Sequence, residues 1–257
     1  MATKSPVQVV LLGHRARVGK DTLAEYLVKE QGFIRIGFAD KLKEMVADLY
    51  GFSHEQMYGS EKDVPDERYP NNIDPKEIRE YYGNGDSGYH LVFNPEYKSF
   101  LTPRRILQTF GQDQRRIFQN VWAQYVFNQI DAISSCGDPS VSKFVITDLR
   151  FPNEYEVAKH WERGPNQLEM FPRKVLAIQI IRPDLPPISG ADDISETALA
   201  NFEHWDGTIV NDTGIDDLYG KYNTLRMILD NVEFQNILNG AFGELNKERE
   251  KHENQNS

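Results

Sequence analysis

Residues 7–27 read VQVVLLGHRARVGKDTLAEYL, and this stretch decides how the rest of the chain is interpreted. Residues 7–12 form a β-branched, apolar run that is long enough for one buried strand. A loop bounded by Gly13 and Gly19 follows, and after it apolar residues recur at the spacing of an amphipathic helix. We therefore expect a strand, a glycine-bounded loop and a helix in direct succession.

The junction between this loop and the helix has the chemistry of a phosphate cradle. Gly19 is followed by Lys20, Asp21 and Thr22. The backbone N–H groups of such a loop and the helix N-terminus attract an anion, Lys20 adds a full positive charge, and the Thr22 hydroxyl can hold Mg²⁺. The pattern predicts a phosphate-binding loop of the P-loop kind.

The stretch departs from the usual P-loop pattern at two positions. His14 stands where the first glycine is expected, with Gly13 one residue early. Asp21 follows Lys20, so the hydroxyl of Thr22 comes one place late, as in the G-K-x-T loops of adenylate-kinase-like proteins. The alternative is a plain strand–turn–helix with a chance Gly-Lys pair, and the strand, glycines, lysine and hydroxyl in one context argue against it.

Composition restricts the class of protein. The chain has 257 residues, 39% hydrophobic and 26% charged, which suits one globular unit with insertions. A net charge of -10 argues against a broad nucleic-acid-binding surface, although a local basic pocket for a small phosphorylated substrate remains compatible with it. The single cysteine, Cys136, fits a reducing compartment, and no apolar run reaches the length of a membrane span. We expect a cytoplasmic protein with no membrane or nucleic-acid partner.

Further apolar runs alternate with helical patterns along the chain. We expect Asp40 and Thr102 to cap helices, and Gly111 to break a long helical region in two. This alternation predicts an α/β fold, a P-loop NTPase-like three-layer αβα arrangement around a five-stranded parallel sheet. After the first strand, strands are expected at 33–38, 143–148, 175–181 and 207–211, and helices at 40–50, 102–133, 155–161 and 215–232.

Chemically capable side chains follow the expected strands. Asp40, Asp148, Arg182 and Asn211 each come at or after a strand's C-terminal end, where parallel sheets bind ligands. An acid at the tip of a buried strand is where P-loop enzymes hold the metal or its water, so Asp148 is a candidate, with a helix cap as the alternative. Asp40 and the nearby Lys43 can face a substrate. Alternatively, Asp40 caps the helix and Lys43 lies on its solvated face, and the local sequence leaves both alternatives open.

The expected domain organisation follows from changes in composition. Residues 51–100 hold several prolines, a glycine-rich turn and many aromatics, and we interpret them as an acceptor-binding insertion. Residues 183–204 resemble a lid, and residues 244–257 form a charged, flexible tail. The remaining ranges, 1–50, 101–182 and 205–243, are expected to form the core.

With these residues in view, the chain resembles the deoxynucleoside monophosphate kinases of tailed bacteriophages, which are P-loop phosphotransferases. The resemblance covers most of residues 7–222. It rests on motifs in a fixed order: Gly19-Lys20-Asp21-Thr22, Phe38-Ala39-Asp40-Lys41-Leu42-Lys43, Arg104-Arg105-Ile106-Leu107-Gln108 with Gly111, Asp113 and Trp122, Asp148-Leu149-Arg150 with Glu154, Arg182-Pro183, Ser195-Glu196 and Asn211-Asp212.

The resemblance implies transfer of the γ-phosphoryl group of ATP to a nucleoside monophosphate, with Mg²⁺. It implies that Lys20, Asp21, Arg150 and Arg182 serve catalysis and that Thr22 and Asp148 serve the metal. The implied ATP-binding residues are Gly13, Arg15, Arg17, Val18, Gly19, Lys20, Thr22 and Asn211. The implied acceptor-binding residues are Asp40, Lys43, Arg104, Arg105, Gln108, Asp113 and Arg150.

Other interpretations stay open at this point. A P-loop kinase for another small metabolite, of the dephospho-coenzyme A or phosphomevalonate type, would keep the fold and the ATP site. A third interpretation is a non-catalytic nucleotide-binding switch. The absence of an N-K-x-D guanine motif from the sequence argues against it. The sequence does not specify the accepted base, the preference for deoxyribose, or whether the chain forms a homodimer. A phage-encoded chain would act in the host cytoplasm.

Overall fold

The computed structural model describes residues 6–13, 15–69, 100–136, 142–164, 173–185 and 197–232. His14, most of the expected insertion (70–99), half of the expected lid (186–196) and the whole expected tail (244–257) lie outside the described residues. The elements in chain order are β1 (Val7–Gly13), α1 (Lys20–Gln31), β2 (Ile34–Arg35), α2 (Asp40–Tyr50), α3 (His54–Tyr58), the 3-10 helix η1 (Ser60–Asp63), α5 (Pro103–Ile117), α6 (Val121–Cys136), β3 (Lys143–Leu149), α7 (Pro152–Arg163), β4 (Arg173–Ile181), β5 (Gly207–Val210) and a helix over residues 215–232.

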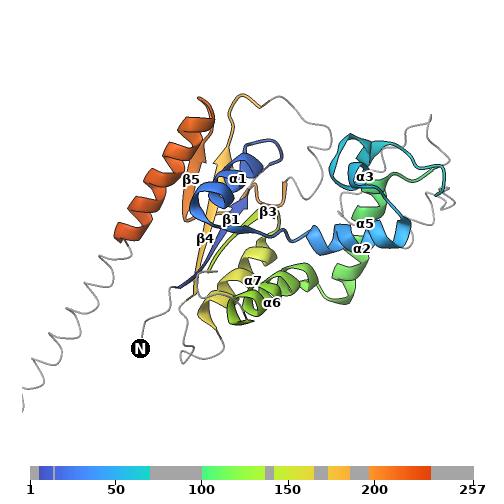
Figure 1. Cartoon of the computed structure of the whole chain (residues 1–257), viewed down its shortest axis with the longest axis horizontal. Coiled ribbons are helices and arrows are strands. Elements are labelled where there is room, and N and C mark those ends of the chain that lie inside the picture. The colour runs from blue at the N-terminus through green and yellow to red at the C-terminus, as the bar shows by residue number, and fades with distance from the viewer. Residues whose placement is uncertain are drawn as a thin grey trace, which may run out of the picture.

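Within the described residues the strands form one five-stranded sheet in the order β2-β3-β1-β4-β5, and every neighbouring pair is parallel. β1 lies in the centre, flanked by β3 and β4 (Figure 1). β3 and β4 pair with β1 on opposite sides. The loop after β1 therefore lies at a switch point of the sheet, where α/β proteins of this kind bind ligands. The predicted fold class is confirmed.

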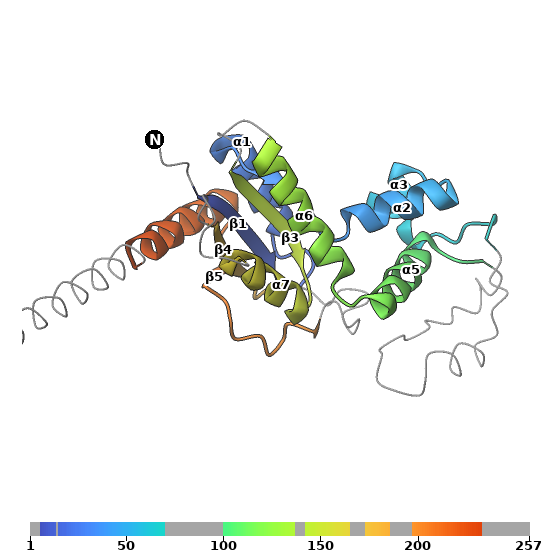
Figure 2. The same cartoon turned by 90° about the horizontal axis from the view of Figure 1, so that it is seen from below.

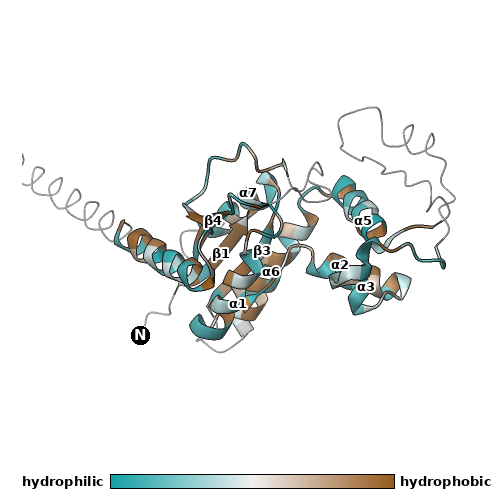
Figure 3. Cartoon of the chain, turned by 90° about the horizontal axis from the view of Figure 1, so that it is seen from above, coloured by the Kyte–Doolittle hydropathy of each residue, from teal (hydrophilic) through white to brown (hydrophobic). Residues whose placement is uncertain are grey.

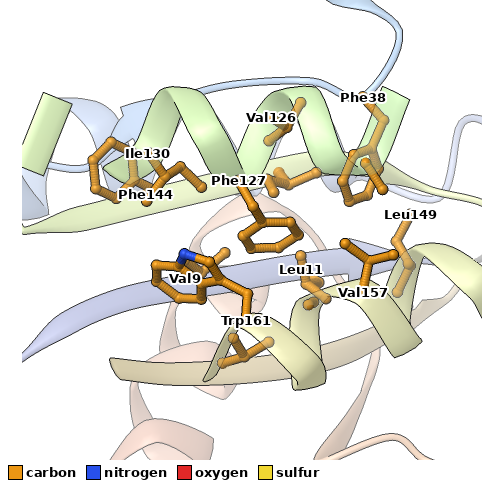
Figure 4. Packing of buried hydrophobic residues seen from close by; sticks show 14 of the residues in the cluster. Val9, Leu11, Phe38, Val126, Phe127, Ile130, Phe144, Leu149, Val157 and Trp161 are labelled. Carbon is orange, nitrogen blue, oxygen red and sulfur yellow. The ribbon is translucent and has the colours of Figure 1, made fainter. Parts of the chain in front are cut away.

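Alternation along the strands sends side chains to two separate cores, one on each face of the sheet. On one face, Val9 and Leu11 of β1 pack with Phe127 of α6 and Trp161 of α7 (Figure 4). On the other face, Val10 and Leu12 pack against α1 and the helix at 215–232. Figure 3 shows the central strands in brown, the hydrophobic end of its scale. These two cores give the three layers that the sequence predicts.

A third apolar cluster lies away from the sheet and joins α2, α3 and α5. Val46 of α2, Met57 of α3 and Ile106 of α5 are buried in it, together with Trp122 at the start of α6. Figures 1 and 2 show this helical group to one side of the sheet, connected to it by the chain leading into α2 and by α6. The group therefore has its own small core and presents its helices beside the sheet.

Three local predictions are wrong, and two of them concern residues 33–40. The strand expected at 33–38 is only two residues long, because the N–H groups of Gly37, Phe38 and Ala39 bond to carboxylates of Asp40 and Asp148 instead of a neighbouring strand. Asp40 is accordingly the first residue of α2 and not its N-cap, which is Ala39.

Gly111 does not break the long helix; α5 runs through it to Ile117, and the break follows at residues 118–120. The glycine serves close packing instead. A Cβ at this position would lie 2.8 Å from Leu42 Cδ2 of α2, and the Gly111 carbonyl accepts the indole N–H of Trp122 at 3.2 Å. The predicted cap at the start of α5 is confirmed, since the Thr102 hydroxyl accepts the N–H of Arg105 at 3.1 Å.

Candidate functional site

The loop after β1 is closely approached by other parts of the chain at both of its glycines. A Cβ on Gly13 would lie 2.3 Å from an atom of the Trp205 ring, and one on Gly19 would lie 2.6 Å from Asn211 Nδ2. Gly19 also has a φ of +109°, in the left-handed region that glycine adopts without strain. Both positions therefore require glycine for the loop to keep this shape.

Lys20 begins α1 directly after Gly19 and is buried, 9% exposed. Its ammonium group donates to the carbonyl of Arg15, so the side chain folds back across the loop. Gly19 is the N-cap and has no side chain to accept the first N–H groups of α1. A buried cation and a helix start with no side-chain cap from Gly19 are what a phosphate group needs at this position.

The remaining loop residues differ in exposure. Arg15, Arg17 and Asp21 are exposed, Val18 is buried, and Thr22 is half-buried in the first turn of α1. Arg17 has a φ of 62°, in the left-handed region. The side chains of the two arginines are thus open to solvent.

Asn211, expected near the adenine, contacts the loop itself. Its side-chain amide donates to the Val18 carbonyl at 2.9 Å, and its backbone N–H donates to the Ile181 carbonyl at 2.7 Å. Asn211 thereby ties the end of β5 to the glycine loop and to β4. The structure gives this residue a role in holding the loop.

The register between β1 and β3 brings the loop beside the Asp148–Arg150 turn. Gly13 is paired with Leu149, so Asp148 and Arg150 flank the residue that lies next to the start of the loop. The Asp148 carboxylate accepts the N–H groups of Phe38 at 2.8 Å and Ala39 at 2.9 Å. Asp148 therefore fixes the approach to α2, and its role toward a metal stays a prediction.

Four cations, three from helices and one from this turn, are near enough for their charges to interact. They are Lys43 of α2, Lys62 of η1, Arg104 of α5 and Arg150 after β3. Burial lowers the pKa of Lys62, and the positive charges of Lys43, Arg104 and Arg150 lower it further. Burial is also the main reason that the pKa of Lys43 is lowered, with Arg35 and Arg150 adding to it and Asp148 and Asp40 opposing it. We call these four residues the cationic cluster.

Such a cluster is electrostatically unfavourable unless negative charge is supplied. Like charges that lie close together in a partly buried setting repel each other and disfavour their own ionised forms. Asp63 offsets part of this charge by pairing with Arg104, at 3.0 Å between Nη2 and Oδ2. The cluster is therefore suited to an anion with more than one negative charge, such as a phosphate monoester.

The other predicted acceptor residues lie near the cluster or further along α5. Asp40 accepts the Gly37 N–H at 2.7 Å and lies 3.4 Å from Arg35, at the start of the helix that carries Lys43. Arg105 and Gln108 are half-buried on α5, and Asp113 lies 3.7 Å from Arg116 further along it.

Arg182 is exposed and follows the end of β4. It is therefore at the same edge of the sheet as the loop, although no described contact joins it to Lys20 or to the cluster.

The donors available for Mg²⁺ are oxygens. Thr22 offers a hydroxyl in α1, Asp148 offers a carboxylate at the end of β3, and α1 and β3 are in contact. Mg²⁺ is commonly held by one or two carboxylates together with the phosphates of a substrate. These residues fit a Mg²⁺ ion that arrives with a nucleotide, which would supply charge neutralisation between the phosphates.

Two residues that the structure places at the site escaped prediction. Lys62 lies in the composition-biased segment after residue 51, where no helical or strand pattern marks a charge as functional. The sequence marks Glu154 only as part of a motif, whereas in the structure its side chain is 3% exposed and contacts the Arg150 turn. An acid three residues into a helix is a signal for capping, and it could have identified Glu154.

The chain is similar to a curated viral protein over most of its length. The chain is 27% identical over 227 residues to a protein of Acanthamoeba polyphaga mimivirus provisionally named deoxynucleotide monophosphate kinase, with 84% of this chain and 93% of the relative covered. No family model matches the chain.

Solved structures are similar to the chain only at a distance. A sugar kinase from Janibacter sp. HTCC2649 is 14% identical with a TM-score of 0.39, covering 87% of this chain and 95% of that one. A dephospho-CoA kinase from Campylobacter jejuni is 14% identical with a TM-score of 0.38, covering 87% and 98%. At these TM-scores neither structure contributes to the assignment of function.

The glycine loop after the central strand, its buried lysine and the parallel sheet have the geometry of a P-loop fold, and the curated relative carries the name of a kinase. The relative's name points further, to a deoxynucleotide monophosphate as the acceptor for that protein. In the part of the chain that the structure describes, no helix is both long and apolar enough to span a membrane.

Proposed function

We propose that this protein is an ATP-dependent kinase that transfers the γ-phosphoryl group of ATP to a deoxynucleoside monophosphate. The observation that carries the proposal is the pairing of Gly13 with Leu149, which sets the phosphate-binding loop beside the turn that leads into the cationic cluster. One anion-binding element would then hold the donor and the other the acceptor, next to each other at one edge of the sheet.

In this account the loop from Gly13 to Gly19 and Lys20 hold the phosphates of ATP. The bond between the γ-phosphorus and the ADP oxygen breaks as a bond to an oxygen of the acceptor's phosphate forms. Lys20 neutralises the charge that develops on the transferring group and on ADP, and Arg182 with Arg15 and Arg17 adds positive charge from the exposed side. Phosphoryl transfer needs alignment and charge cancellation, so no covalent nucleophile is required.

The cationic cluster holds the phosphate of the acceptor. Arg104 and Arg150 present planar forks that grip phosphate oxygens in pairs, whereas Lys43 and Lys62 act as point charges. Arg105, Gln108, Asp113 and Asp40 contact the nucleoside of the acceptor. Thr22, Asp21 and Asp148 would hold Mg²⁺ or its waters, and the ion would supply positive charge to the phosphates.

The acceptor class is supported by the name of the mimivirus relative and by the motifs that resemble phage deoxynucleoside monophosphate kinases. It is also supported by the cluster, because the double negative charge of a monophosphate is attracted to a group of cations.

The proposal is tested by ADP release from Mg-ATP against a panel of deoxynucleoside and ribonucleoside monophosphates. Dephospho-coenzyme A and phosphomevalonate serve as matched controls that share the fold's chemistry with a different acceptor. Turnover with one or more deoxynucleoside monophosphates is the expected result. Turnover only with a control would overturn the acceptor assignment and retain the kinase, whereas tight ATP binding without any turnover would favour a nucleotide-binding switch.

A further inference from the structure

Glu154 is a buried carboxylate at the turn that carries Arg150. It is the third residue of α7 and 3% exposed. One of its oxygens accepts two backbone N–H groups, that of Arg150 at 2.9 Å and that of Phe151 at 3.1 Å. The carboxylate therefore holds the backbone from which the Arg150 side chain leaves.

The second oxygen of Glu154 faces a cation from another part of the fold. Oε1 lies 3.8 Å from Nη2 of Arg115, which belongs to α5. The Arg115 guanidinium also lies over the Phe151 ring, with 4.7 Å between Cζ and the ring centroid. A separate hydrogen bond, from the Asn153 side-chain amide to Asn120 Oδ1 at 3.0 Å, joins α7 to the turn that follows α5. The turn after β3 and the C-terminal half of α5 are thus connected by several polar contacts.

Burial of the Glu154 carboxyl penalises its charged form. Burial raises the pKa of Glu154 to about 7, with Asp148 adding to the rise and Arg115 opposing it. A glutamine could accept the same two N–H groups without that penalty, although it could not attract Arg115. What the carboxylate adds is the electrostatic link to α5, which carries Arg104 and Arg105 of the proposed acceptor site.

We propose that Glu154 is a positioning residue that fixes Arg150 and couples it through Arg115 to α5, so that both sides of the acceptor site move together. This inference rests on the proposed function for its catalytic consequence. The inference has a structural half, which is the link between the Arg150 turn and α5, and this half does not depend on any substrate.

Hydrogen–deuterium exchange without nucleotide tests the structural half. Arg115→Gln leaves Glu154 in place and removes only the link, so we expect faster exchange in the peptide over residues 148–154 as well as in α5. Glu154→Gln should accelerate exchange in α5, whereas Glu156→Gln, an exposed neighbour on α7, should change neither region. Unchanged exchange at 148–154 in Arg115→Gln would overturn the coupling.

Kinetics at pH 8 test the catalytic half through a double-mutant cycle. Glu154→Gln is expected to lower kcat/KM for the acceptor about tenfold by misplacing Arg150, while ATP affinity and folding are retained. Adding Glu154→Gln to Arg150→Ala should cause no further loss, because Glu154 acts through Arg150. Losses that multiply would overturn the positioning role. If the wild-type chain uses no monophosphate at all, the proposed function fails, and the exchange result still decides the coupling.

Discussion

Lys20 is the residue on which the proposed chemistry depends most directly. We expect Lys20→Met to lower kcat at least about 100-fold, because it removes a preorganised charge from the transferring phosphoryl group. The fold should persist, since methionine has a similar length and the position is buried. Steady-state kinetics and a thermal melt check both parts.

Lys29→Met is the matched control for this change, because Lys29 lies on the same helix with an exposed side chain paired to Glu25. It should leave turnover unaltered. Near-normal turnover of the Lys20 variant would remove the loop from the active site.

Lys62 gives a second test at the residue scale. Its pKa is lowered by burial and by three neighbouring cations, so an acceptor phosphate is the favourable partner for its charge. We expect Lys62→Met to raise the KM of the acceptor about tenfold while the KM of ATP stays constant, as for the loss of one charge-assisted hydrogen bond.

Lys41→Met provides the comparison, since Lys41 lies on α2, the helix that carries Lys43, and pairs with Glu44 at 3.0 Å. Equal effects of the two substitutions would mean that the cluster does not contact the acceptor.

At the scale of elements, Gly111 joins α5 to α2. Alanine is favoured over glycine in a helix by about 1 kcal/mol, yet its Cβ would lie 2.8 Å from Leu42 Cδ2. Overpacking of this kind costs about 1–3 kcal/mol, so we expect Gly111→Ala to lower the free energy of unfolding by roughly 1 kcal/mol net. Denaturant unfolding measures the change.

Gly220→Ala separates helix propensity from this close packing. Gly220 lies in the helix at 215–232, and nothing lies within 4 Å of a Cβ built there. That variant should be more stable than the wild type by up to about 1 kcal/mol. A gain in stability at both glycines would show that α5 and α2 separate easily.

Gly111 also shows where prediction from sequence stops. Periodicity located β1, α1, α2, β3, β4 and β5 closely, because each buries a stripe or a face of apolar side chains. It failed where a tertiary contact decides the outcome: Leu42 requires a glycine inside α5, and Asp148 diverts the N–H groups that would have extended β2.

At the scale of the whole molecule, the same limit applies to the site. The strand ends predicted that the loop, Asp148 and Arg150 would share one edge, and the register of β1 with β3 confirms that arrangement. Lys62 comes to the site only because α3 and η1 fold back against α5, a packing that no local pattern encodes.

Glu154 predicts a pH dependence of global stability. Its pKa is raised from 4.5 to about 7 in the folded chain, so folding favours the protonated form. The contribution of this group is fully present below pH 4.5 and is lost as pH rises through about 7, by roughly 3 kcal/mol at most.

Glu154→Gln does not titrate, so its free energy of unfolding should gain on that of the wild type between pH 5 and pH 8. Denaturant titrations of both chains measure this difference. A constant difference across the range would mean that Glu154 keeps an ordinary pKa.

Transfer of the γ-phosphoryl group from ATP to a deoxynucleoside monophosphate can be followed at the phosphorus atoms. ATP, Mg²⁺ and a deoxynucleoside monophosphate are mixed with the protein and observed by ³¹P NMR. We predict that the ATP γ-resonance declines in step with the appearance of ADP and of a deoxynucleoside diphosphate, one for one. Loss of the γ-resonance to inorganic phosphate alone, or its persistence with every monophosphate, would contradict the claim.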